Sequence, residues 1–126
     1  MRDEQVRRYA RHILLADVGG LGQTALMVSS ARLTVDGEPS AALLAATFLA
    51  AGGVGTLVMH GTTESQRSEL AAHGPDTQIL ERGDAKDLEL GEIPSWWPQA
   101  TGDATALAFW RGASAATRWM ASIANR

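Results

Sequence analysis

The residues between Leu33 and Gly55 have the arrangement of a phosphate-binding strand, turn and helix. A short apolar strand ends before Gly37, a long apolar helix pattern follows, and Gly-Val-Gly precedes a second strand. In dinucleotide and ATP sites of this layout the turn reads G-x-G-x-x-G. The second glycine there lets phosphate approach the backbone, and the third lets helix and strand pack closely. Those two positions hold Pro39 and Ala42, so the sequence keeps the scaffold and loses the phosphate chemistry.

The charges of this turn also oppose a phosphate. Pro39 has no N–H to offer at the helix N-terminus. Asp36 and Glu38 add two carboxylates, and two like unit charges ~5 Å apart repel by roughly 3 kcal/mol at an effective dielectric near 20. The same acids stabilise the helix dipole. Gly37 is therefore interpreted as a remnant of the phosphate turn, while Pro39, Ser40 and Ala42 mark lost positions, and we expect ATP not to bind.

Other candidate residues carry weaker signals. The stretch from Gly20 to Ala25 formally matches G-x-G-x-x-A, but it follows a helical pattern rather than a strand, which indicates a helix–helix turn. His12, His60 and His73 lack the i, i+4 spacing of metal ligands and are interpreted as surface or packing histidines.

The tryptophans allow two interpretations. Tryptophan is enriched at binding hot spots, so these side chains could mark an interface. At least two of them could equally cover the sheet of a small domain. The four residues are Trp96, Trp97, Trp110 and Trp119.

Composition limits the class of protein. The chain has 126 residues, 45% of them hydrophobic, which fits one soluble domain. No apolar run approaches the ~20 residues of a membrane span, and no signal segment is expected. A net charge of −3 argues against nucleic acid as the main partner. The absence of cysteine excludes thiolate catalysis and Cys-type zinc sites, and it fits a cytoplasmic protein.

Strand and helix patterns alternate along the chain, which predicts a parallel sheet with right-handed crossovers. The expected fold is α/β, a Rossmann-like parallel sheet of about four strands with flanking helices and an N-terminal helical extension. We expect one domain, 1–126, with the extension at 1–30 and the α/β core at 31–126. The expected helices are 3–15, 23–29, 40–51, 64–73 and 114–124, and the expected strands are 33–35, 56–59, 78–80 and 106–110.

Several segments together resemble a known family. They are Arg8–Leu15 (R-Y-A-R-H-I-L-L), Gly22-Gln23, Leu49–Leu57 (L-A-A-G-G-V-G-T-L) and Ala116–Trp119 (A-T-R-W). This order is similar to the start of the ThiF/MoeB/HesA adenylyltransferases, in the superfamily of the ubiquitin-activating enzymes. The resemblance implies a domain that binds ATP and Mg²⁺ and adenylates the C-terminus of a ubiquitin-like or sulfur-carrier protein.

The same resemblance implies that this copy is inactive. The catalytic aspartate of the family falls on Ala113, and its ribose-binding acid falls near Gly61. We therefore expect a non-catalytic, ThiF/MoeB-like subunit that acts as a homodimer, or as a heterodimer with an active homologue. The alternative is a residual ATP-dependent adenylyltransferase that activates a carrier-protein C-terminus. No cofactor is expected, and ATP and Mg²⁺ would bind only if the family site survives.

The N-terminal arginines are the remaining candidates. In dimers of that family, the arginine matching Arg11 reaches the ATP of the other subunit, which implies a trans-acting role for Arg11 and a weaker one for Arg8. The alternative is that both arginines are solvated on an amphipathic helix.

Overall fold

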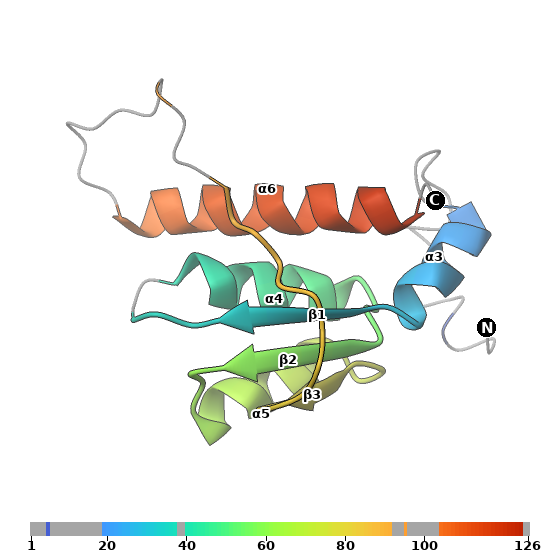
Figure 1. Ribbon diagram of the computed structural model, residues 1–126, viewed down its shortest axis with the longest axis horizontal. Coiled ribbons are helices and arrows are strands. Elements are labelled where there is room, and N and C mark those ends of the chain that lie inside the picture. The colour runs from blue at the N-terminus through green and yellow to red at the C-terminus, as the bar shows by residue number, and fades with distance from the viewer. Residues whose placement is uncertain (1–4, 6–18, 38–39, 92–94, 96–103, 125–126) are drawn as a thin grey trace.

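A computed structural model describes residues 5, 19–37, 40–91, 95 and 104–124 (Figure 1). These residues form three parallel strands and four helices. The elements, in chain order, are α3 (Gly19–Met27), β1 (Ser30–Thr34), α4 (Ala41–Ala51), β2 (Thr56–His60), α5 (Glu64–His73), β3 (Gln78–Leu80) and α6 (Ala104–Ala124).

The strands lie in the order β1-β2-β3. Ser30 pairs with Thr56, and Thr56 pairs with Gln78, so the strands are in parallel register. On the other edge of β1, Arg32 forms a single parallel bridge with Asp87. The chain that leaves β3 therefore returns across the sheet to β1 before it continues to α6 (Figure 1).

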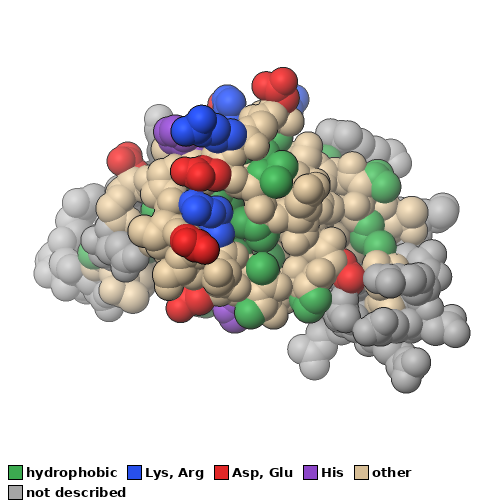
Figure 2. Space-filling model, turned by 90° about the horizontal axis from the view of Figure 1, so that it is seen from below, with side chains coloured by type: hydrophobic (Ala, Val, Ile, Leu, Met, Phe, Trp, Pro, Cys, Tyr) green, Lys and Arg blue, Asp and Glu red, His purple; other side chains and the backbone are tan. Residues whose placement is uncertain are grey.

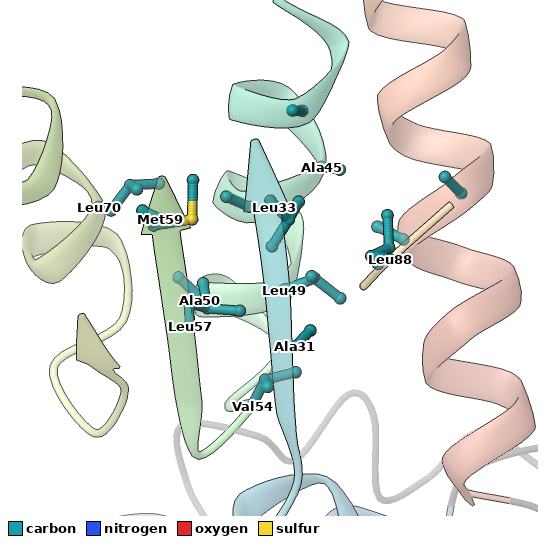
Figure 3. Packing of buried hydrophobic residues seen from close by; sticks show 14 of the residues in the cluster. Ala31, Leu33, Ala45, Leu49, Ala50, Val54, Leu57, Met59, Leu70 and Leu88 are labelled. Atoms are coloured by element: carbon teal, nitrogen blue, oxygen red, sulfur yellow. The ribbon is translucent and has the colours of Figure 1, made fainter. Parts of the chain in front are cut away.

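Alternation along the strands separates the two faces of the sheet. Ala31 and Leu33 of β1 and Leu57 and Met59 of β2 are buried against the helices. They pack with one face of α4 and with Leu70 of α5 (Figure 3). Removing such side chains from water supplies most of the driving force for this fold.

Local signals explain where α4 begins and ends. The Ser40 hydroxyl accepts a hydrogen bond from the Leu43 N–H at 3.1 Å, which caps the helix. After α4, the Gly52 N–H donates to the Phe48 carbonyl at 2.9 Å, and Gly53 has a φ of 84°. A left-handed residue of this kind suits glycine and ends the helix.

Helix α6 packs mainly against α4 and also against α3. Its buried side chains are small, and they are Ala108, Gly112, Ala115 and Ala116, with Ile123 near its end. Because these residues are small, the two helix backbones approach closely. The Cβ of an alanine at Gly112 would lie 2.7 Å from the Ala41 carbonyl oxygen.

The fold differs from the sequence-based expectation. The sheet that the structure describes has three strands, so the expected Rossmann-like sheet of about four strands is wrong. The segment predicted as a fourth strand, 106–110, lies inside α6. Its short apolar run fits either element, and the buried positions that continue at helical spacing beyond it decide for helix.

Other predicted elements are confirmed. The structure has a helix at Glu64–His73 and a strand at Gln78–Leu80, as expected. The helix expected over 3–15 lies outside the described residues, apart from Gln5, which is helical and buried. Within the described part of the chain, no helix is both long and apolar enough to cross a membrane.

Candidate functional site

The turn before α4 holds the first candidate residues. Gly37 has a φ of 81°, and nothing lies within 4 Å of the position that a Cβ would take there. Ser40 and Ala42 are both buried, and the Ser40 hydroxyl is already occupied by the Leu43 N–H. A free N–H at this helix N-terminus is what a phosphate would use. One such donor is thus taken by the cap, while Pro39 lies outside the described residues.

The structure does not bring the remaining sequence candidates together in one site. Arg8, Arg11 and His12 lie outside the described residues. His60 ends β2, His73 ends α5, and both are exposed. Across 19–37, 40–91 and 104–124, no group of three or more metal-ligating side chains gathers.

The candidates on α6 and α3 have structural roles. Ala113, Trp110 and Trp119 are half-buried on α6, while Trp96 and Trp97 lie outside the described residues. The stretch from Gly20 to Ala25 lies inside α3, so its interpretation as a helix–helix turn is wrong.

Helix α4 has a second apolar face, which the sequence analysis missed. None of its 11 residues is charged. Besides its buried face, it presents Leu44, Thr47, Phe48 and Ala51 on the side away from the sheet, at positions i, i+3, i+4 and i+7. Phe48 is 36% exposed, and Ala51 is also exposed. A helix that is apolar all round is normally buried on every side.

Helix α6 extends this face. Phe109 is 54% exposed, and its ring lies edge-to-face with Phe48, with centroids 5.8 Å apart and planes at 75°. Ala106, one turn earlier, is exposed as well. We call this surface the α4–α6 apolar face, and its residues are Leu44, Thr47, Phe48, Ala51, Ala106 and Phe109.

A groove runs beside the α4–α6 apolar face, between α4 and α5. Its volume is about 320 Å³. Leu43, Leu44 and Thr47 form one wall, and Leu70 lies in the other. Glu69 and His73 of α5 give the groove a polar rim. An apolar ridge and a groove with a polar border therefore adjoin on the same helix layer.

Comparisons with known proteins give one structural likeness. No family model matches the chain, and a search of curated proteins returns no match. A solved structure titled "Crystal Structure of SeMet PaaA" matches with a TM-score of 0.52 and 19% identity, over 94% of this chain. The chain spans about half the length of that one, 48%. At this identity the match describes the fold alone.

These comparisons overturn the resemblance to the ThiF/MoeB/HesA adenylyltransferases. The assignment rested on short motifs that no family model recovers, and the matching structure is a PaaA. Packing accounts for two of those motifs. The Gln23 amide donates to the Gly52 carbonyl at 2.8 Å, and a Cβ at Gly55 would lie 2.2 Å from the Met27 carbonyl oxygen. These residues join α3 to the end of α4, so they do not indicate adenylyltransferase chemistry.

Proposed function

We propose that this chain is a non-catalytic association subunit that acts by dimerisation through its α4–α6 apolar face, by default with a second copy of itself. The observation that carries the proposal is the uncharged helix α4, whose outer positions stay partly exposed. Contiguous exposed apolar surface of this kind is typical of protein–protein contacts. An active homologue or a ubiquitin-like carrier protein as partner followed only from the rejected family, so neither is proposed.

The exposed aromatic area sets the strength that we expect. A phenylalanine buries roughly 200 Å², so the exposed parts of Phe48 (36%) and Phe109 (54%) amount to about 180 Å² per copy. At ~25 cal/mol/Å² their burial contributes roughly 4–5 kcal/mol per copy. Association itself costs about 4–15 kcal/mol. We therefore expect a dissociation constant on the order of micromolar.

The turn at Gly37–Ser40 supports a function without a nucleotide. Its cap already uses one donor, and Asp36 is an exposed acid beside it. No binding of Mg-ATP tighter than roughly a millimolar remains our prediction, and isothermal calorimetry tests it. We also expect the subunit to act in the cytoplasm, which its cysteine-free composition supports.

The experiment is sedimentation equilibrium from about 1 to 100 μM with three proteins. The wild type should show a monomer–dimer equilibrium, and Phe109→Glu should remain monomeric, because a buried unpaired carboxylate is costly. Val28→Glu is the matched control: Val28 is 83% exposed, lies outside the face, and should dimerise like the wild type. A wild type that stays monomeric, or a Phe109→Glu variant that dimerises normally, rules out this face as the contact.

A further inference from the structure

The sheet has an open face opposite α4 and α5. The strand residues that alternate with the buried ones point to it, among them Arg32 and Thr34 of β1 and Val58 and His60 of β2. Thr34 and His60 are register partners at the carboxyl ends of adjacent strands. Their side chains therefore lie next to each other at the end of a parallel sheet where α/β proteins commonly bind ligands.

The segment after β3 turns part of this face into a hollow of about 380 Å³. It is held to β1 by two backbone hydrogen bonds of 2.9 Å, from the Arg32 N–H to the Lys86 carbonyl and from the Leu88 N–H to the Arg32 carbonyl. Val58 lines the hollow and is only 2% exposed, and Gly83 lies against it. The hollow thus has walls that the backbone fixes.

Both acids at the hollow already have basic partners. The Arg32 guanidinium binds both carboxylate oxygens of Asp87, at 2.6 and 3.0 Å, and this hydrogen bonding lowers the pKa of Asp87. The Glu81 carboxylate lies 3.9 Å from the Arg67 guanidinium. Figure 2 shows basic, acidic and histidine side chains gathered in a band on the side of the molecule that it displays.

Two basic side chains at the hollow remain available. Arg82 and His60 both line it, and neither side chain forms a hydrogen bond or ion pair with any residue that the structure describes. Thr34 adds an exposed hydroxyl from the same side. A guanidinium, an imidazole and a hydroxyl together offer donors and positive charge with no acid left uncompensated.

We propose that this hollow is a binding site for a small anion, a carboxylate or a phosphate group, held by Arg82, His60 and Thr34. The guanidinium fork matches the paired oxygens of either group. The site is separate from the α4–α6 apolar face, so it goes beyond the association function and does not depend on it.

The test is a titration of the ¹⁵N-labelled protein with inorganic phosphate and, separately, with succinate, followed by NMR. Sodium chloride at matched ionic strength is the reference. Saturable shifts at the amides of Thr34, His60 and Gly83 with either anion are expected, and the anion that binds more tightly identifies the group recognised. Arg82→Gln should weaken binding about tenfold, because a charge-assisted hydrogen bond is lost.

Arg118→Gln is the matched control, because Arg118 is an exposed arginine on α6, away from the hollow lining. It should leave the titration unchanged. The proposal is overturned if neither anion causes saturable shifts at tens of millimolar, if chloride gives the same shifts, or if Arg82→Gln and Arg118→Gln weaken binding equally. The amide spectrum of each variant shows directly whether it is folded.

Discussion

The close contact between α4 and α6 gives a quantitative prediction for Gly112→Ala. The new Cβ would lie 2.7 Å from the Ala41 carbonyl oxygen and 2.9 Å from both the Ala45 nitrogen and the Leu44 Cβ. Two of these three atoms belong to backbone, so a side-chain rotation cannot relieve the contact. The helices must separate, and α4 and α6 share the largest helix–helix contact of the described fold.

The expected size follows from two opposing effects. Overpacking a well-packed contact costs about 1–3 kcal/mol. Alanine gains about 1 kcal/mol over glycine in a helix interior. We therefore expect Gly112→Ala to lower the free energy of unfolding by roughly 1–2 kcal/mol, and Gly112→Val to lower it further, because valine adds bulk and is a weaker helix former than alanine.

Urea unfolding followed by circular dichroism measures this loss, with the slope of the transition unchanged. Using Phe109→Glu as the background keeps dimerisation from contributing. Ala106→Val is the control, since it adds bulk at an exposed position of the same helix and should change stability by about 0.5 kcal/mol. If Gly112→Ala is neutral or stabilising, the helices do not pack as closely as described and the reasoning is refuted.

Two further predictions concern the ends of elements and the edge of the sheet. Ser40→Ala should cost about 1 kcal/mol of stability by urea unfolding, because the Leu43 N–H loses its 3.1 Å partner, and an unchanged midpoint would contradict the cap. The pKa of Asp87, measured by NMR, should lie below its usual range and rise toward it in Arg32→Gln. Because the folded pKa is lowered, the stabilising effect of this pair is present above the unfolded pKa and is lost as the pH falls through the folded value.

Much of the fold could be predicted because its signals are local. The helix at Glu64–His73 begins with a capping box, in which Thr63 and Gln66 satisfy each other's backbone N–H groups. Strand β2 is a short apolar run behind glycines. Helix α6 was not predicted over its full length because Gly112 interrupts a helical pattern, and only the tertiary structure shows that this glycine permits close packing.

The candidate site was harder to predict than the fold. An uncharged helix such as α4 has no polar side in the sequence, so its composition cannot tell which positions face the sheet and which face outward. The absence of charge from Ala41–Ala51 was the available signal, and it indicates that both faces need a covering. The motifs at Gly22-Gln23 and Gly55 were misinterpreted, because packing of backbone against backbone selects the same small residues as a binding site does.

The central claim, that two copies meet through the α4–α6 apolar face, is tested most directly by disulfide crosslinking. The chain has no cysteine, so a single one can be introduced at Ala51, which is exposed on the outer side of α4. Ala72→Cys on α5 is the control, as another exposed alanine outside the face. At tens of micromolar under mild oxidation, Ala51→Cys should form a covalent dimer much faster than Ala72→Cys, and Phe109→Glu should abolish the difference. Equal rates for the two cysteines, or no dimer from Ala51→Cys, would contradict the account.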